Sequence, residues 1–407
     1  MSKYTSDFFE KKKEWSKIKD ELLACYLKPY MQKIMFTGHP VNYIDCFAGK
    51  GKFADGYDGS PLIALKIIEE CKETSSVKNL LIRSYFIEEK YGEELSENLI
   101  GFNNIEIIKH TYVDSVKSIL QNKSGQNLFL YIDPYGVKCL DFNLFKYFTQ
   151  VDANSVEVLL NFNSFGFIRE ACRVLKADDG IIKSLDDIIV EIIDSSFYFN
   201  SSNLLSISEL DDIVGGNYWQ KIIRDYISEQ FDCYEAERKI TTEFCKRLQS
   251  FYKYVVNMPI RLKAGGLPKY RMIHMTNNED GCILMFKNIC KRFEHLVYIQ
   301  TQKQGLLFEI DETPENEVID ERAVKQKICE FLKNCKEFVH LNVFISKFIT
   351  ENGIICKPQN IINILKKLEE ENMLIVRRFP ELKQFSKKKR VFWEEKRNQS
   401  VEIRTIG

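Results

Sequence analysis

The chain has 407 residues, a length that predicts two or three domains rather than one. Its 58 lysines and arginines balance 58 aspartates and glutamates, so the overall charge indicates no polyanionic partner, and any nucleic-acid surface must be a local patch. The twelve cysteines include no Cys-x-x-Cys pair, which is typical of reduced cysteines in a cytoplasmic protein and not of a zinc site or a disulfide framework. The five histidines show no metal-ligand spacing, so we expect no metal. No apolar signal region or membrane-spanning apolar run is present, so we expect no membrane segment.

The first expected element is a long amphipathic helix over residues 6–37, within an N-terminal covering segment of residues 1–40. Large apolar side chains recur at helical spacing and form one face of this helix. They are Trp15, Ile18, Leu22, Tyr26 and Tyr30. Ser16 and Lys19 are polar members of the same helix.

Residues 41–300 alternate between strand-like and helix-like segments, which predicts an α/β domain with a Rossmann-like sheet. Because the strands are apolar throughout, we expect a mostly parallel sheet with helices on both faces. Strands are predicted at residues 42–47, 83–88, 105–109, 128–132 and 156–162, with a helical insertion at 165–250. Residues 251–260 and 270–275 then add a last pair of strands.

The C-terminal part changes character after an acidic, polar linker within residues 301–321. Residues 322–407 are predicted to form a winged-helix-like domain, because three helices are followed by a hairpin. The helices are expected at residues 323–332, 341–351 and 358–371, and the hairpin strands at 374–378 and 390–393. A lysine-rich turn over residues 386–390 would be the wing.

The most informative segment runs from Tyr43 to Gly51, where a buried strand leads through Asp45 into a loop containing Gly49 and Gly51. In open α/β sheets this turn is where a nucleotide-like ligand binds. Glycines are suited to it because a Cβ atom would block close approach of the backbone to the ligand. Asp45, at the end of the strand, can pair with a cationic group of such a ligand.

Five segments carry a resemblance to the three-Cys-motif partner family, a group of bacterial proteins similar to Rossmann-fold methyltransferases. They are residues 43–51, 59–65, 86–88 and 133–136, and the run from Met275 to Gly281 with Met285. The loop, the Gly-Ser-Pro-Leu-Ile-Ala helix start and the Asp-Pro-Tyr segment are also more distantly similar to the J-type 23S ribosomal RNA adenine-N6 methyltransferase. The first resemblance extends to about residue 300, and the second covers mainly the first 140 positions.

The resemblance implies S-adenosylmethionine as cofactor and a set of residues that bind it. Glu88 ends the second main strand, and its carboxylate can accept both ribose hydroxyls. Asp114, after Tyr112 and Val113, stands where methyltransferases often place a residue that contacts the adenine amino group, and Lys19 lies on the helix that covers the cofactor in the resembled enzymes. The full cofactor-binding set expected is Lys19, Asp45, Phe47, Gly49, Gly51, Ser60, Glu88 and Asp114.

The resemblance also implies catalysis by Asp133, Pro134 and Tyr135. In amino-methyltransferases the corresponding tetrapeptide is Asp/Asn-Pro-Pro-Tyr/Phe. Its acidic or amide side chain and its first proline carbonyl accept from the target amine, while its aromatic ring stacks on a flipped base. This chain departs from the pattern, because the second proline is missing and the aromatic residue has moved one place forward. Tyr135 could therefore be a wall residue of the site instead.

A nucleic-acid contact is expected at the wing. Between Lys366 and Arg397 the sequence has eleven lysines and arginines but only six glutamates, and this local excess of positive charge fits phosphate contact. The residues expected to bind nucleic acid are Lys387, Lys388, Lys389 and Arg390, with Arg169 beside the catalytic edge. Solvated lysines and a surface charge are the alternative interpretations.

Two hypotheses of different class follow. The first is a methyltransferase acting on nucleic acid, with adenine N6 as its target and a three-Cys-motif radical-type protein as a possible partner implied by the resemblance. The second is a non-catalytic adaptor that keeps the Rossmann scaffold and binds a partner or nucleic acid through its tail. A protein substrate is a third option, and backbone contacts do not separate RNA from DNA.

Overall fold

The structure is a computed structural model that describes residues 9–190, 205–260, 268, 270–304, 321–380 and 392–406. The chain forms two compact units, the first ending at Asn277 and the second beginning at Asn278. The sequence had placed the end of the first domain at residue 300. None of the described helices combines the length and the apolar character needed to cross a bilayer.

The first unit is built on a seven-stranded sheet with the strand order β3-β2-β1-β4-β5-β7-β6. The strands are β1 (Val41–Asp45), β2 (Ile82–Ile87), β3 (Ile105–Ile108), β4 (Asn127–Ile132), β5 (Ser155–Phe162), β6 (Tyr254–Ile260) and β7 (Tyr270–Thr276). The five neighbouring strands β3, β2, β1, β4 and β5 pair in parallel, whereas β7 runs antiparallel to both β5 and β6. The α/β class and the antiparallel pair expected of a Rossmann-like methyltransferase sheet are confirmed.

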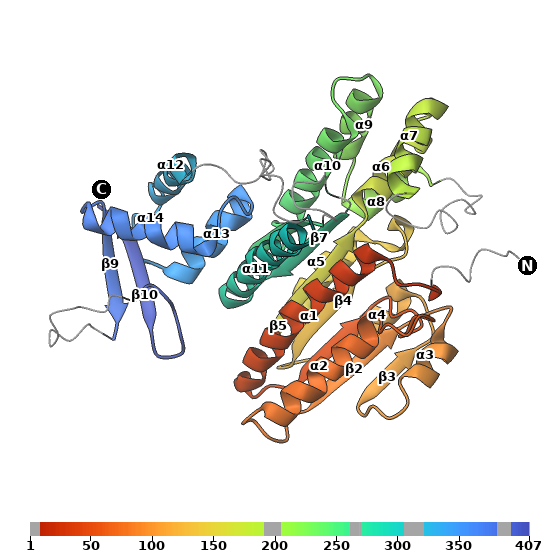
Figure 1. The fold of residues 1–407 in the computed structure, drawn as a ribbon, viewed down its shortest axis with the longest axis horizontal. Helices are drawn as coiled ribbons and strands as arrows, with labels where there is room; N and C mark the ends of the chain where they lie inside the picture. Colours follow the sequence, from red (N-terminus) through yellow and green to blue (C-terminus); the bar gives the residue numbers. More distant parts are fainter. Residues whose placement is uncertain are drawn as a thin grey trace, which may run out of the picture. The chain divides into compact units, whose positions relative to one another are not determined.

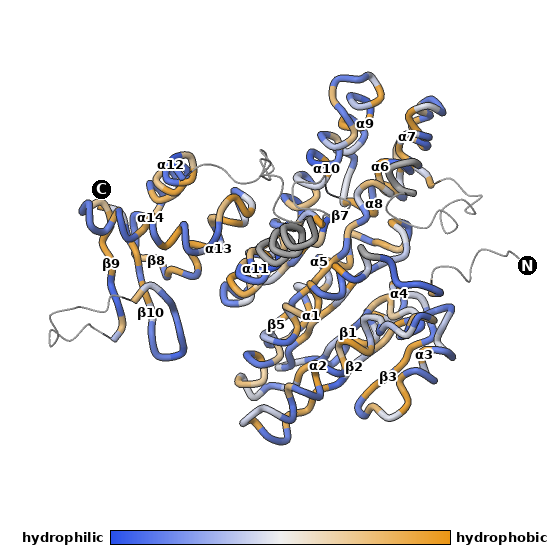
Figure 2. Tube along the Cα trace, in the orientation of Figure 1, coloured by the Kyte–Doolittle hydropathy of each residue, from blue (hydrophilic) through white to orange (hydrophobic). Residues whose placement is uncertain are grey.

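The parallel strands are mostly apolar because helices cover the sheet on both sides. Every residue of β1, β4 and β7 is buried, and Figure 2 shows apolar colour along the strands and hydrophilic colour in the loops. Helix α1 (Glu14–Ile34) precedes the first strand, and α2 (Ser60–Thr74), α3 (Gly92–Asn98), α4 (Tyr112–Leu120) and α5 (Phe142–Gln150) connect the parallel strands. Helices α1 and α2 lie side by side (Figure 1).

Helix α1 is fixed on the sheet by a buried polar network. The Tyr26 hydroxyl group donates a hydrogen bond to the Glu157 carboxylate of β5. The same hydroxyl oxygen lies 3.0 Å from Nε2 of His274 on β7, and this nitrogen is also 3.0 Å from the Glu157 carboxylate. The network joins one helix to two neighbouring strands, so it sets how α1 is positioned along the sheet.

The predicted insertion is helical, as expected. It comprises α6 (Ser164–Val174), α7 (Asp179–Val190), α8 (Ile207–Val214), α9 (Tyr218–Ile227) and α10 (Cys233–Leu248). A buried ion pair joins α10 to the sheet, because Arg271 of β7 donates to both carboxylate oxygens of Glu237 at 2.8 and 2.7 Å. The Ser164 hydroxyl donates to the same carboxylate at 2.7 Å.

The second unit contains α11 (Glu279–Gln304), α12 (Glu321–Leu332), α13 (Leu341–Asn352) and α14 (Pro358–Glu370). Its three-stranded sheet has the order β8-β10-β9, formed by β8 (Val339–His340), β10 (Ser400–Thr405) and β9 (Leu374–Phe379). The three tail helices and the first hairpin strand lie where the sequence predicted them. The second strand does not: β9 pairs with Ser400–Thr405, and residues 392–395 form no strand. Assignment as a winged helix stays a prediction.

We predict that Glu237→Gln lowers the free energy of unfolding by about 3 to 5 kcal/mol, because it leaves the Arg271 guanidinium buried without its counter-charge. Urea denaturation measures this loss. The matched control is Glu235→Gln on the same helix, whose partner Arg238 is largely exposed; it should change stability by less than about 1 kcal/mol. Equal effects of the two substitutions would contradict a stabilising role for the buried pair.

Candidate active site

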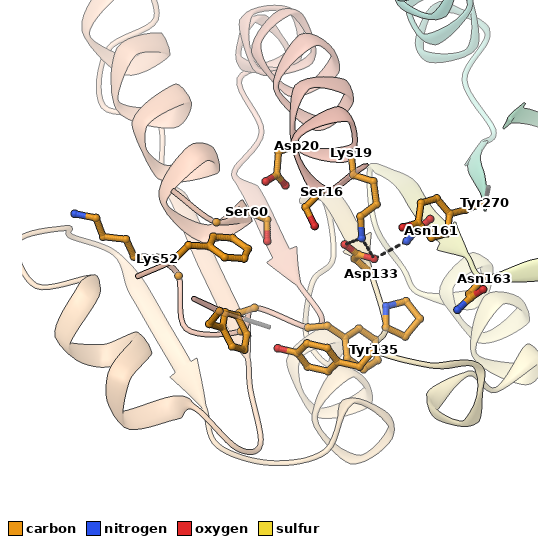
Figure 3. Close-up of a pocket in the computed structure, with 18 residues that line it drawn as sticks. Ser16, Lys19, Asp20, Lys52, Ser60, Asp133, Tyr135, Asn161, Asn163 and Tyr270 are labelled. Atoms are coloured by element: carbon orange, nitrogen blue, oxygen red, sulfur yellow. Dashed lines mark hydrogen bonds and ion pairs between the residues drawn. The ribbon is translucent and has the colours of Figure 1, made fainter. Parts of the chain in front are cut away.

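A cavity opens at the carboxyl ends of β1, β4 and β5, on the side where α1 crosses the sheet (Figure 3). This edge is where open α/β sheets bind ligands. Residues from five regions of the sequence line it. They are Phe9, Ser16, Lys19, Asp20, Phe47, Ala48, Gly49, Gly51, Lys52, Phe53, Gly59, Ser60, Asp133, Pro134, Tyr135, Asn161, Asn163 and Tyr270.

The loop after β1 requires glycine at two positions. Gly49 and Gly51 have φ angles of +62° and +75°, in the left-handed region that side chains rarely adopt. A Cβ atom on Gly49 would lie 3.0 Å from the Tyr135 hydroxyl oxygen and 3.2 Å from the Phe9 ring. The loop therefore presents bare backbone to the cavity, as the sequence indicated.

Asp45 lies at the bottom of this loop and is fully buried. Its carboxylate accepts hydrogen bonds from the Ser60 hydroxyl at 2.7 Å and from the Phe47 backbone N–H at 3.2 Å. Burial raises the pKa of Asp45 to about 7, because the charged form loses its hydration. Three residues predicted separately, Asp45, Phe47 and Ser60, are thus brought together.

Glu88 lies beneath the glycine loop and does not itself line the cavity. Its carboxylate accepts from the backbone N–H groups of Gly49, Lys90 and Tyr91 at 2.7, 2.9 and 3.2 Å. The Tyr135 hydroxyl donates to it at 3.4 Å. Glu88 is therefore close to Gly49, and its expected contact with a ribose stays a prediction.

Asp133 follows β4 and is the centre of a polar cluster that Figure 3 shows facing the cavity. Lys19 of α1 donates to both of its carboxylate oxygens, at 2.8 and 2.6 Å. The Asn161 side-chain amide donates to one oxygen at 2.7 Å, and the Tyr131 hydroxyl lies 3.4 Å from the other. Lys19, which was expected to bind the cofactor, is thus hydrogen-bonded to Asp133, which was expected to be catalytic.

Asp20 is a site residue that the sequence analysis missed. It lines the cavity beside Lys19 and forms an ion pair with the buried Lys12. Burial raises the pKa of Asp20 to about 6, and the nearby Lys12 ammonium opposes this shift. Its position next to Lys19, on a helix expected to cover the site, was the available signal. Tyr270, at the start of β7, is a second residue that was not foreseen.

Two other residues that were expected to bind a ligand, Asp114 and Arg169, do not line this cavity. Asp114 is exposed on the first turn of α4, where it accepts a hydrogen bond from Thr111 at 2.6 Å and lines a different depression. Arg169 is fully buried in ion pairs with Glu170 and Asp186, which gives it a structural role in place of the expected phosphate contact. Residues 387–390 lie outside the described residues. Within the described ranges, no three histidine, cysteine or acidic side chains gather as metal ligands.

Comparison with known proteins adds two solved structures, whereas no family model and no curated protein matches the chain. One is a cyclopropane-fatty-acyl-phospholipid synthase-like protein from Lactobacillus casei ATCC 334, with 10% identity over 62% of this chain and 90% of that one, and a TM-score of 0.23. The other is the plantazolicin methyltransferase BpumL in complex with a monoazolic desmethylPZN analog and SAH, with 14% identity over 64% and 84%, and a TM-score of 0.28. Because both TM-scores lie below 0.5, we assign the fold from the strand order alone.

The raised pKa of Asp45 predicts a pH-dependent stability. Between about pH 4 and pH 7 the folded protein keeps a proton on Asp45 that the unfolded chain has lost, so ionisation at Asp45 destabilises the fold as pH rises. Asp45→Asn should remove this loss, which between pH 5 and pH 8 is on the order of 3 kcal/mol, because about two of the three pKa units lie above pH 5. Urea unfolding at pH 5 and pH 8 tests it. Wild-type and variant free energies that change in parallel with pH would contradict the prediction.

Proposed function

We propose that this protein is a cytoplasmic S-adenosylmethionine-dependent methyltransferase that acts on a nucleic-acid amino group, with adenine N6 the first candidate. The observation that carries the proposal is that the glycine loop and Asp133 line one cavity at the carboxyl edge of the sheet, and that Ser60, which also lines it, donates to the buried Asp45. A cofactor loop and an amine-accepting aspartate must share one cavity for methyl transfer, because the reacting atoms have to meet.

The residues present fit this cofactor. Bound S-adenosylmethionine would supply a methyl group activated by a positively charged sulfonium. Asp20 lines the cavity and offers a carboxylate to a cationic group, and such pairing is stronger in a partly buried cavity than in water. Gly49 and Gly51 line the cavity without side chains, and Glu88 holds this loop by accepting from the Gly49 backbone N–H.

We therefore predict micromolar binding of adenosylhomocysteine, about −8 kcal/mol, measured by calorimetry. Gly49→Val should abolish the binding, because its side chain would collide with the Tyr135 hydroxyl and the Phe9 ring, both of which belong to residues that line the cavity. Gly125→Val is the matched control: Gly125 also has a positive φ, at +67°, but a Cβ atom there meets nothing within 4 Å. Wild-type binding of NAD with no response to adenosylhomocysteine would refute the cofactor assignment.

The amine acceptors in this proposal are Asp133 and Asn161. Asn161 donates its amide N–H to Asp133, which leaves its side-chain oxygen without a hydrogen-bond partner among the described residues. Since that oxygen is buried at the cavity, a target N–H group is a suitable donor for it. Asp133 and Asn161 could then hold one amine between them and direct its lone pair towards the methyl group.

The aromatic ring that stacks on a base would be Tyr270 and not Tyr135. The Tyr135 hydroxyl lies against Gly49 and Glu88, so Tyr135 is a wall on the cofactor side. Tyr270 lines the opposite part of the cavity, near Asn161 (Figure 3), and the Lys19 ammonium lies 5.7 Å from its ring centre. Base stacking on aromatic rings is the usual way to hold an extruded base.

A nucleic-acid partner is also supported by the second unit. On its three-stranded sheet, the guanidinium groups of Arg377 and Arg404 lie 3.6 and 4.7 Å from the ring centre of Phe338. Cations beside an aromatic ring are the groups that bind single-stranded nucleic acids. We propose that this sheet and the lysine-rich residues 387–390 of the sequence contact the substrate, with a three-Cys-motif protein as a further candidate partner.

One observation favours the alternative, a non-catalytic adaptor. Both oxygens of Asp133 are held by Lys19, so the proposed amine acceptor is occupied. The two functions differ in a measurable way, because only the enzyme leaves a modified base in the cell.

We predict that mass spectrometry of digested RNA and DNA finds a methylated base in cells with this gene that is missing in cells without it. Asp133→Ala should remove the modification while keeping cofactor binding, because an interaction made with the reacting amine acts on turnover. Asp152→Ala, at an exposed position away from the cavity, is the control. Full activity of Asp133→Ala would exclude the proposed role, and identical nucleic acids with and without the gene would favour the adaptor.

A further inference from the structure

The acceptor capacity of Asp133 is fully used. An ionised carboxylate has about four lone-pair positions, two on each oxygen. One oxygen accepts from Lys19 at 2.8 Å and from Asn161 at 2.7 Å, and the other accepts from Lys19 at 2.6 Å and from Tyr131 at 3.4 Å. An incoming amine can therefore donate to Asp133 only after one of these donors has left.

Lys19 is the donor that is able to leave. Tyr131 is fully buried within β4, and Asn161 belongs to the buried end of β5, so neither side chain has space to turn away. Lys19 has a flexible four-carbon stem, comes from a helix that lies over the cavity, and carries its ammonium at the cavity wall. Its side chain is 9% exposed, so it would leave Asp133 only for another anionic partner.

The proposed cofactor carries such a partner, because its amino-acid end has a carboxylate. Among the described residues that line the cavity, the lysines are Lys19 and Lys52. The Lys52 side chain points away from the cluster around Asp133 in Figure 3. The nearby Lys12 is held by Asp20 and by the backbone carbonyl of Asp58 at 2.6 Å. Lys19 is thus the cation best placed for a ligand carboxylate.

We propose that Lys19 exchanges partners during the reaction: without cofactor it holds Asp133, and with cofactor it pairs with the cofactor carboxylate and releases Asp133 to the target amine. This inference rests on the proposed function and adds to it an order in which the ligands bind. The amine acceptor becomes available only once the cofactor is bound, so an amine substrate cannot occupy the site productively before the cofactor.

Binding of two nucleosides distinguishes this exchange of ion-pair partners from a general change in the cavity. Adenosylhomocysteine has the amino-acid carboxylate, whereas 5′-methylthioadenosine has the same nucleoside and a thioether but no carboxylate. In calorimetry on the full-length protein, Asp133→Asn should strengthen adenosylhomocysteine binding about tenfold, because Lys19 no longer has to be taken from a charged partner. Lys19→Met should weaken it about tenfold or more. Neither variant should change binding of 5′-methylthioadenosine.

The double variant completes the test. With Lys19→Met present, Asp133→Asn should lose its effect on adenosylhomocysteine, because the residue that it sets free is missing. Lys28→Met, on the same helix but paired with the exposed Glu70, is the control and should bind both nucleosides like the wild type. Thermal melting confirms that each variant is folded before binding is measured.

The possible failures are distinguishable. If the wild type binds both nucleosides but Asp133→Asn leaves adenosylhomocysteine binding unchanged or weaker, the exchange is refuted while the cofactor assignment stands. Parallel changes for both nucleosides also refute it, because the carboxylate would then play no part. A wild-type protein that binds neither nucleoside overturns the proposed function and the exchange with it.

Discussion

The candidate site depends on how α1 is held against the sheet, and the buried network of Tyr26, Glu157 and His274 provides that constraint. Tyr26 follows Lys19 by seven residues, or two helical turns, so the two side chains lie on the same face of α1. Fixing Tyr26 between β5 and β7 therefore fixes where Lys19 meets Asp133 at the end of β4. The edge of the sheet and this helix both contribute to the site, and a shift of α1 by one turn would move its side chains by about 5.4 Å relative to the sheet.

Charge is the second constraint on the site. Asp133 lies close enough to raise the pKa of both Asp20 and Asp45, and Asp20 also raises the pKa of Asp45, while Lys12 and Lys19 lower the pKa of Asp20. Such a group is costly in a folded protein, because buried carboxylates lose hydration that hydrogen bonds replace only in part. The cost at Asp45 is visible in its pKa of about 7. A cationic ligand would relieve it, and ligand sites are where perturbed pKa values gather.

Much of the sheet and part of the site could be predicted from the sequence. Apolar runs located all seven strands to within a few residues, and Gly49, Gly51 and Asp45 were identified because a tight turn and a strand end leave a local pattern. The pairing of Lys19 with Asp133 leaves no such pattern, since 114 residues separate them and only the packing of α1 brings them together. Asp114 failed for the same reason: its place on the first turn of α4 depends on where that helix packs. The strand expected at residues 390–393 was wrong because Trp393 is buried outside the sheet, and an apolar residue in the core need not belong to a strand.

If the cofactor proposal holds, the same charges also favour turnover. Transfer of the methyl group converts a positively charged sulfonium into a neutral thioether, so a cavity lined by Asp20 and Asp133 holds the product less strongly than the cofactor. When the product leaves, its carboxylate leaves with it, and Lys19 returns to Asp133, the nearest anion on the opposite wall. The ion pair between Lys19 and Asp133 would then do more than stabilise the empty site: it would compensate the buried Asp133 charge whenever no ligand is present to do so. In this view the departure of the Asp-Pro-Tyr-Gly segment from the common tetrapeptide is compatible with catalysis, because the acceptor that matters is kept and α1 controls when it is available.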